Sequence, residues 1–387
     1  MTTIEKDKQY IANTYGRFPV TLVSGHGATA VDENGKEYID MGTGIGVNAF
    51  GYCDKEWVEA VTKQLNTLQH TSNLFYTQPG VELAEILCKK SGMKKCFFGN
   101  SGAEANECAI KAARKYSLDK YENPDRNVII SLTQSFHGRT LATLKATGQD
   151  VFHTTFGPFP EGFVYAEANN FDSFMNVYNE NVCAVIMEMV QGEGGVIPLN
   201  NNFIKKVIEF CKEYDIIVII DEVQTGNGRT GSMYAYQQFG IEPDLVSTAK
   251  GVAGGLPMGV CLFGEKTKDT MTPSSHGSTF GMNPVVAAGA LTIVKRLDDE
   301  FLASVRVKGE YIRNRLADCK NVKSVTGMGL MLGIETTKDA KEVVMKCIEK
   351  GVLPLTAKTK IRLLPPLNIS EKELEKAMDI ITEVIEE

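Results

Sequence analysis

The segment DLVSTAKGVAGGLPMG, residues 244–259, links a short apolar run to a glycine-rich stretch through one lysine, Lys250. The run has the length and β-branched content of a buried strand. The glycines after it leave the backbone free to approach another molecule closely. Because lysine side chains normally lie in water, Lys250 is either an ordinary surface residue or an amine placed at a strand end for its chemistry.

Similar apolar runs alternate with helical patterns from about residue 94 onward. This alternation is typical of a parallel sheet covered by helices, so we expect an α/β fold. Residues 201–215, NNFIKKVIEFCKEYD, carry apolar side chains at helical spacing and predict a crossover helix. The other strand candidates are CFF (residues 96–98), NVIISL (127–132), AVIMEMV (184–190) and IIVII (216–220).

The length of 387 residues predicts two packed domains, because single cores rarely grow so large. After Gly281 the apolar spacing is helical over residues 302–316 and 374–384, which predicts a separate C-terminal α/β layer. A hairpin-like segment, GATAVDENGKEYIDM (residues 27–41), lies near the N-terminus. We expect an N-terminal segment, residues 1–45, packed with a small C-terminal domain, residues 286–387, and a large domain between them, residues 46–285.

The composition favours a small ligand. The chain has a formal charge of -7 and no basic blocks, which argues against a nucleic-acid or membrane-surface partner. Its nine cysteines are scattered without CxxC or metal-ligand spacing, so we expect reduced thiols, no metal site and a cytoplasmic location. We also expect no export signal or bilayer-spanning segment, because the apolar strings are short.

A helix start follows the first strand candidate, in GNSGAEANECAIKAARKY (residues 99–116). Ser101 and Glu104 have the spacing of a capping box, which by itself only begins a helix. The alternative is a seat for a phosphate, because free N–H groups and the positive end of the helix dipole favour an anion. Gly102 would let that anion come close. The sequence leaves both interpretations open.

Asp221 follows IIVII, a run apolar enough to be buried on both faces. A buried carboxylate without a partner is costly, so Asp221 either caps a turn or faces a cation. In the second case it would keep a bound heterocyclic nitrogen protonated. Gln224, three residues later, is placed to donate to an oxygen on the same ring.

Lys250 stands at the same position after its own strand. Partial desolvation would lower its pKa and make it a nucleophile toward an aldehyde. Ligands of open α/β sheets bind beyond the carboxyl ends of the strands, so the anion seat, Asp221 and Lys250 are expected at one edge. Together these are the three groups that pyridoxal phosphate requires.

Longer motifs spread over nearly the whole chain resemble the class III, pyridoxal-phosphate-dependent aminotransferases of fold type I, and within them the acetylornithine aminotransferases. The resemblance implies a large cofactor-binding domain with a mainly parallel seven-stranded sheet and a smaller α/β domain. It extends from NTYGRFPV to IRLLPPLNIS and includes HTSNLFYTQPGVELAE, NSGAEANECAIKAARKY, SFHGRTLATLKATGQ, MEMVQGEGGV, IIDEVQTGNGRTG, AKGVAGGLPMG and HGSTFGMNP.

Residue by residue, the resemblance implies a cofactor site. Lys250 would bond covalently to the cofactor aldehyde, and Asp221 would pair with its pyridine nitrogen. The other implied contacts are Ser101, Gly102 and Ala103 around the phosphate, Phe136 stacked on the ring, Gln224 beside the ring hydroxyl, and Thr279 on the phosphate of the neighbouring subunit's cofactor. The Thr279 contact implies a homodimer with shared active sites.

The resemblance also implies how two substrates use one site. Arg139 and Tyr15 would clamp the carboxylate at the far end of the amino donor. Arg362 would bind the α-carboxylate of glutamate, with Glu193 as its switchable partner. When the donor reacts through its distal amine, Glu193 can neutralise Arg362, and glutamate later displaces Glu193. Taken singly, Arg139 suits a surface ion pair, Glu193 a turn and Phe136 a core position, so only the shared motifs favour these roles.

The implied reaction moves the distal amino group of N2-acetylornithine to 2-oxoglutarate, giving N-acetylglutamate 5-semialdehyde and glutamate, a step of arginine biosynthesis. Ornithine aminotransferases carry an aromatic residue where this chain has Ile45, and a smaller side chain leaves space for an acylated amine. Ornithine, succinylornithine, acyl-lysine analogues and 4-aminobutyrate are the alternative donors, because the Arg139 clamp recognises only a carboxylate.

The chain departs from the family pattern at three positions. Tyr52 and Asp54 stand where the family usually has histidines in its GHxHP stretch. Met282 stands where glycine is common. No proposed catalytic atom is affected, but the local loop geometry is left open.

Two hypotheses from other classes are weaker. A non-catalytic nucleotide-binding α/β protein would be expected to carry GxxxxGK, or GxGxxG between a strand and a helix, and this chain has neither. A pyridoxal-phosphate mutase or decarboxylase on the same fold would have no use for the Glu193 and Arg362 switch.

Overall fold

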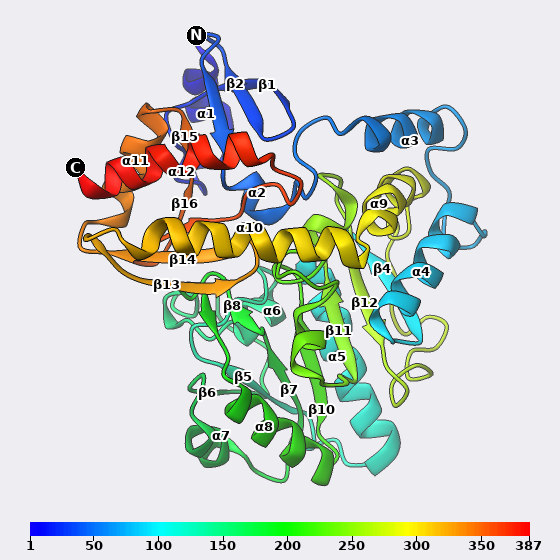
Figure 1. Ribbon diagram of the computed structural model, residues 1–387. Helices are drawn as coiled ribbons and strands as arrows, with labels where there is room; N and C mark the ends of the chain where they lie inside the picture. The colour runs from blue at the N-terminus through cyan, green and yellow to red at the C-terminus, as the bar shows by residue number, and fades with distance from the viewer.

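A seven-stranded sheet forms the centre of the larger part of the molecule. The computed structural model describes residues 1–387, and Figure 1 shows the sheet flanked by helices. β12 runs antiparallel to both neighbours, and the other strands share one direction, so their carboxyl ends meet at one edge. In spatial order the strands are β4 (Lys95–Gly99), β12 (Gly259–Phe263), β11 (Leu245–Thr248), β10 (Ile217–Asp221), β7 (Val182–Met187), β5 (Val128–Leu132) and β6 (Phe163–Ala166).

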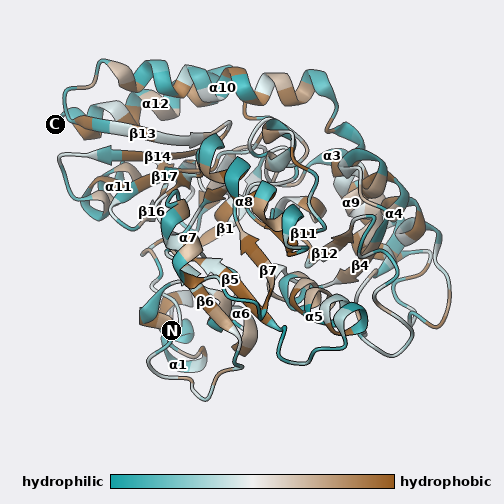
Figure 2. Cartoon of the chain, turned by 90° about the horizontal axis from the view of Figure 1, so that it is seen from below, coloured by the Kyte–Doolittle hydropathy of each residue, from teal (hydrophilic) through white to brown (hydrophobic).

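The central strands are apolar throughout because both faces of the sheet are covered. Along β10, Ile217 and Ile219 belong to one hydrophobic cluster, and Val218 and Ile220 belong to the other. Successive side chains of a strand point to opposite faces, so each face needs its own apolar residues. Figure 2 shows hydrophobic strands between helices whose outer surfaces are hydrophilic.

Helices on opposite faces complete this α/β sandwich. α5 (Gly102–Tyr121) packs its alanines and Cys108 into one cluster, and α8 (Asn201–Glu213) packs Ile204 and Val207 into the other. The predicted crossover helix at residues 201–215 is therefore confirmed. No helix has both the length and the apolar character needed to cross a membrane. The other helices of this part are α3 (Lys55–Leu65), α4 (Gln78–Ser91), α6 (Leu141–Ala146), α7 (Phe171–Val177) and α9 (Pro284–Arg296).

The two ends of the chain come together on one side of the molecule (Figure 1). β3 (Glu37–Asp40) of the N-terminal segment pairs in parallel with β15 (Val352–Leu353). The remaining elements on this side are α1 (Thr3–Tyr10), β1 (Leu22–His26), β2 (Thr29–Asp32), α2 (Thr43–Gly46), α10 (Asp299–Ala317), β13 (Val322–Met328), β14 (Met331–Thr336), α11 (Ala340–Glu349), β16 (Leu355–Ala357), β17 (Lys360–Leu363) and α12 (Glu371–Glu386). Where one domain ends and the next begins stays a prediction.

The five predicted strands are all present, but β6 and β12 were not among them. The long run at residues 184–190 ends as a strand at Met187, and a separate two-residue strand, β8 (Val190–Gln191), then pairs with β9 (Ile197–Pro198). The predicted apolar faces of residues 302–316 and 374–384 are buried in α10 and α12.

The three departures from the family pattern are accommodated locally. Met282 has a φ of 60°, the left-handed region that glycine adopts most easily, which explains why glycine is common there. Asp54 accepts from the N–H of Trp57 at the start of α3 and forms a two-armed ion pair with Arg296. Tyr52 donates a hydrogen bond to Asp40 at 2.7 Å.

Candidate active site

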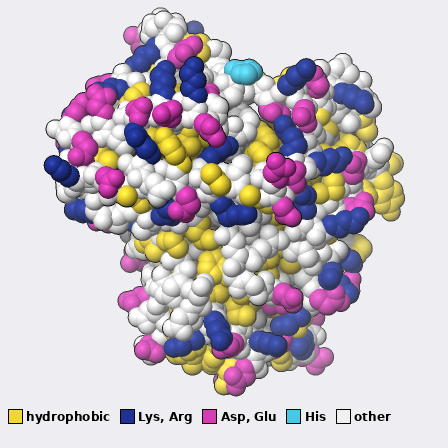
Figure 3. Space-filling view, viewed as in Figure 1, with side chains coloured by type: hydrophobic (Ala, Val, Ile, Leu, Met, Phe, Trp, Pro, Cys, Tyr) yellow, Lys and Arg dark blue, Asp and Glu magenta, His cyan; other side chains and the backbone are white.

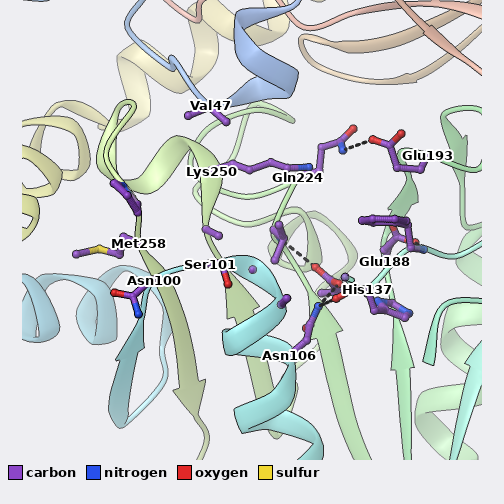
Figure 4. A pocket seen from close by; sticks show the side chains of 18 of the residues that line it. Val47, Asn100, Ser101, Asn106, His137, Glu188, Glu193, Gln224, Lys250 and Met258 are labelled. Atoms are coloured by element: carbon purple, nitrogen blue, oxygen red, sulfur yellow. Dashed lines mark hydrogen bonds and ion pairs between the residues drawn. The ribbon is translucent and has the colours of Figure 1, made fainter. Parts of the chain in front are cut away.

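A cavity of about 370 Å³ opens at the carboxyl edge of the central sheet. The segments that follow β4, β5, β7, β10 and β11 all contribute side chains to it, as expected for an open α/β sheet. Figure 4 shows these side chains converging from separate strands and from the start of α5. Among the residues proposed from the sequence, those lining the cavity are Ser101, Gly102, Ala103, Phe136, Glu193, Asp221, Gln224 and Lys250.

Asp221 is held from both of its oxygens at the end of β10. Its Oδ2 bonds His137 Nδ1 at 2.8 Å and accepts from Asn106 Nδ2 at 2.8 Å, while Oδ1 accepts from the N–H of Val223 at 2.9 Å. The residue is 3% exposed. Asp221 thus caps a turn, which is one of the two sequence alternatives, and has polar partners in the core as well. Its pairing with a bound ring nitrogen stays a prediction.

Lys250 begins a short 3₁₀ turn directly after β11. Its φ of 45° lies in the left-handed region, where non-glycine residues are uncommon and are concentrated at functional sites. Burial lowers the pKa of Lys250 below its ordinary value, although nearby Glu193 acts in the opposite direction. Figure 4 shows the side chain extending through the cavity toward Gln224. Lys250 is therefore not an ordinary surface lysine.

The start of α5 combines a helix cap with free amides. Glu104 donates its N–H to Ser101 Oγ, and its carboxylate accepts from the N–H of Asn100 rather than from that of Ser101. The amides of Gly102 and Ala103 form no hydrogen bond within the chain. A Cβ added to Gly102 would lie 2.7 Å from Val223 Cγ1, so only glycine fits there without a shift. The capping residues therefore leave two amides facing the cavity.

A second charged group lies at the other end of the cavity. Arg362 Nη1 donates to Glu193 Oε1 at 2.5 Å, and Gln224 bonds both residues at 3.2 Å. Burial opposes ionisation of Glu193, but Arg362 outweighs it and lowers the pKa of this carboxyl. Arg362 Nε is buried without a hydrogen-bond partner. Because buried polar atoms are rarely left unpaired, this guanidinium retains a donor that a further acceptor could use.

The structure leaves five proposed residues outside the cavity lining: Arg362, which meets it through Glu193 and Gln224, and four others. Tyr15 is 68% exposed and lies against Arg17, and Thr279 is also exposed. Ile45 is 41% exposed on α2. Arg139 lies over the rings of Phe136 and Phe152, beside the site. Their roles stay predictions.

Sequence reasoning missed three polar residues of the site: Asn106, His137 and Glu188. Glu188 lines the cavity, accepts from the N–H of Phe136, and has its pKa raised by burial and by nearby Asp221. A signal was present for each residue. Asn106 is a polar residue on the apolar face of α5, His137 follows Phe136 directly, and Glu188 interrupts an otherwise apolar run.

Comparison with known proteins agrees with this geometry. Residues 10–385 match the family model described as aminotransferase class-III. An acetylornithine aminotransferase of Haemophilus ducreyi is 50% identical over 98% of this chain and 98% of that protein. The acetylornithine aminotransferase of Aquifex aeolicus is 44% identical over 97% of this chain and 100% of that protein.

Solved structures show the same fold. An ornithine aminotransferase from Toxoplasma gondii, with partial occupancy of PLP at its active site, superposes with a TM-score of 0.94 at 29% identity, covering 99% of this chain and 93% of that one. An N-acetylornithine aminotransferase from Stenotrophomonas maltophilia superposes with a TM-score of 0.86 at 34% identity, covering 99% of this chain and 98% of that one.

The chain belongs to the class III aminotransferases, which are pyridoxal-phosphate-dependent enzymes. The residues present fit that cofactor. The free amides of Gly102 and Ala103 suit its phosphate, and Asp221 suits its ring nitrogen. Lys250, with its lowered pKa, suits its aldehyde.

Proposed function

We propose that this aminotransferase moves the distal amino group of N2-acetylornithine to 2-oxoglutarate, as a step of arginine biosynthesis. The Glu193–Arg362 ion pair beside a buried Lys250 is the observation that supports the use of one site by two different substrates. The choice of donor is supported by the names of relatives that are 40–50% identical over nearly the whole chain.

Lys250 and Asp221 divide the work at the reacting end. When bound, pyridoxal phosphate supplies an aldehyde that bonds to amines and a ring that accepts the electron pair of a broken C–H bond. Lys250 Nζ, whose pKa is lowered by burial, would take the proton from the substrate carbon and pass it to the cofactor carbon that receives the amino group. Asp221 would keep the ring nitrogen protonated, and His137 and Asn106 hold its carboxylate in place.

Glu193 and Arg362 let one site take two substrates. With a donor that reacts through its distal amine, no carboxylate reaches Arg362, and Glu193 keeps that buried cation neutralised. 2-Oxoglutarate or glutamate brings an α-carboxylate that displaces Glu193 and occupies the guanidinium fork, including the unpartnered Nε. A mutase or decarboxylase would have no use for this exchange.

The carboxylate at the far end of the donor is assigned to Arg139, with Tyr15 beside it. Support comes from the position of Arg139 over Phe136 at the edge of the site. Its guanidinium forms no ion pair inside the chain, so it is free to bind an acid. Ile45 is assigned to the acyl group of the donor.

We also propose a homodimer in which Thr279 of each subunit reaches the phosphate of the other subunit's cofactor. Support comes from an exposed apolar face around Thr279, on the side of α3, α4 and α9 where Figure 3 shows hydrophobic side chains. Asn73 and Asn283 hydrogen-bond the two loops of this face together. Exposed patches of this kind are typical of interfaces. The face comprises Leu74, Phe75, Tyr76 (97% exposed) and Phe280.

The assembly proposal is tested by mixing subunits. Lys250→Ala and Thr279→Ala proteins, each impaired alone, are expected to regain activity when refolded together, because a mixed dimer holds one intact site. Size-exclusion chromatography with light scattering gives the mass. A monomeric, fully active protein would overturn it.

We also propose a cytoplasmic location. It is supported by the nine cysteines, all of which are free thiols.

Initial rates with purified holoenzyme test the proposed donor. N2-Acetylornithine is expected to give a higher kcat/KM than ornithine, succinylornithine or 4-aminobutyrate, each at saturating 2-oxoglutarate. Faster turnover of any of the three overturns the choice of donor but not the class. A cofactor absorbance that glutamate bleaches separates an aminotransferase from a non-catalytic nucleotide-binding protein, which would be colourless.

A further inference from the structure

The turn that carries Ile45 has an unusual backbone. Thr43, Gly44 and Ile45 have φ values of 48°, 63° and 65°, all in the left-handed region. Glycine takes this conformation freely, but threonine and isoleucine are β-branched and are strained in it. Contacts outside the turn must therefore hold it in place.

Asp40, at the end of β3, supplies that support. Its Oδ1 accepts from the N–H groups of Gly42 and Thr43, each at 2.8 Å. Its Oδ2 accepts from the hydroxyl of Tyr52 at 2.7 Å. Asp40 is buried, and Tyr52 packs its ring against Gly25. The tyrosine hydroxyl thus fixes the rotation of the carboxylate that holds both backbone amides.

The same turn leads directly into the cavity. Val47 donates its N–H to the carbonyl of Thr43 at 2.8 Å, and its side chain lines the cavity opposite Lys250 in Figure 4. Thr43 Oγ1 also donates to the carbonyl of Leu364 at 2.6 Å. A change in the turn would therefore move Ile45 and Val47 together.

Arg362, the residue assigned to 2-oxoglutarate, is held by contacts of its own, although Leu364, two residues later, bonds Met41 and Thr43 beside the turn. Its strand β17 is hydrogen-bonded on both sides, with Arg362 opposite Gly333 of β14 and Leu355 of β16. Glu193 and Gln224 fix its side chain from the large domain. Arg362 therefore has strand and side-chain partners outside the turn, and Leu364 is the point where the two supports meet.

We propose that Tyr52 is a positioning residue that sets the donor side of the cavity through Asp40. It acts on the turn and touches neither substrate nor cofactor. The assignment of Ile45 to the donor rests on the proposed function. Without the hydroxyl, Oδ2 of Asp40 loses its partner, the carboxylate rotates, and the strained turn relaxes away from its present position.

The chain contains a matched control. Tyr38 donates its hydroxyl to Asp32 Oδ2 at 2.9 Å, and Asp32 Oδ1 accepts from the N–H groups of Asn34 and Lys36. This second tyrosine–aspartate pair holds a turn in the same way and lies in the same sheet. Its turn does not lead into the cavity, because no residue before Val47 lines it.

The test compares Tyr52→Phe with Tyr38→Phe. Tyr52→Phe is expected to raise the KM for the amino donor about tenfold, because small displacements of binding groups have effects of this order. The KM for the keto-acid acceptor, 2-oxoglutarate, and the cofactor absorbance should stay within about twofold of wild type. Tyr38→Phe should leave both KM values unchanged. In an Asp40→Ala background, Tyr52→Phe should add nothing, because the hydroxyl then has no partner.

An unchanged donor KM in Tyr52→Phe overturns the proposal. So does an equal rise in both KM values, or an equal effect of Tyr38→Phe, since either would mean general weakening of the fold. An additive effect in the Asp40→Ala background would show that Tyr52 does not act through Asp40. The donor used is the amine that wild type turns over fastest, so the comparison stands even if that amine is not N2-acetylornithine.

Discussion

The two ends of the cavity hold their carboxylates in different ways. Asp221 bonds His137, Asn106 and the backbone of Val223, all from the large sheet and its covering helix. Glu193 bonds Arg362, which comes from β17 on the other side of the molecule, and its side chain is 30% exposed. The first carboxylate is fixed by several partners within one rigid layer. The second is held by one charged group, Arg362, and by the amide of Gln224, and we propose that a substrate carboxylate displaces it.

This contrast matches the chemistry proposed for each end. A group that must keep one charge state through both half-reactions benefits from several short hydrogen bonds and complete burial. A group that must give way to a substrate benefits from partial exposure and one exchangeable partner. Lys250 lies between them, and the pKa of its amine is lowered by burial.

The largest expected effect is that of Lys250→Ala, which removes the amine between the two ends. We expect turnover to fall by at least about four orders of magnitude, because both the covalent link and the proton carrier are lost. Lys308→Ala is the control: burial lowers the pKa of this lysine too, but its Nζ bonds the carbonyl of Leu367 away from the cavity. A Lys250→Ala protein that completes both half-reactions at the normal rate would disprove the assignment.

Asp221→Asn tests the fixed end. The amide keeps the shape but removes the charge, so the ring nitrogen is no longer held protonated, and kcat should fall roughly a thousandfold with both substrates. Glu222→Gln is the matched control, because Glu222 is the next residue but bonds Thr225 and Tyr236 instead. Burial raises the pKa of Glu222 to about 7, so replacing its carboxyl by an amide removes less charge than the same change at a fully ionised carboxylate. Equal losses in the two variants would contradict the special role of Asp221.

Glu193→Gln tests the exchangeable end and should act on one substrate only. Arg362 would lose its counter-charge during the donor half-reaction, so the donor KM should rise about tenfold, whereas the KM for glutamate should stay the same or fall. Stopped-flow absorbance measures each half-reaction separately. Glu85→Gln, in an exposed pair with Lys89, is the control. A loss shared equally by both half-reactions would mean that Glu193 is fixed in the way that Asp221 is.

Much of this architecture follows from apolar spacing along the chain. The buried faces of α10 and α12 are the ones that helical periodicity predicts, since each helix packs a single stripe on the layer beneath it. The antiparallel direction of β12 could not be predicted from its sequence. The strands on either side set it, and nothing in its own five residues, GVCLF, distinguishes a parallel from an antiparallel neighbour.

The site was partly predictable for a similar reason. Asp221 ends β10 and Lys250 lies two residues after β11, so sheet geometry alone brings them to one edge. His137 and Asn106 bond Asp221 across 84 and 115 residues of sequence, and no local sequence pattern predicts such a distant partner. The role of the Tyr52 hydroxyl was equally hidden in the sequence, because it depends on the strained turn that Asp40 holds in the folded protein.

The smallest expected effect is on stability, and it again concerns Glu193. Because Arg362 lowers the pKa of this carboxyl below its ordinary value of 4.5, the pair stabilises the folded protein above that pH, and the contribution is lost as pH falls through the lower folded value. The free energy of unfolding of wild type relative to Glu193→Gln should therefore decrease as the medium is acidified below about pH 4.5, measured by thermal denaturation of holoenzyme. Glu213→Gln, at an exposed helix end without an ion pair, should leave the curve unchanged. A pH-independent difference would mean that the carboxylate and the guanidinium do not interact in solution, and the exchangeable end would lose its physical basis.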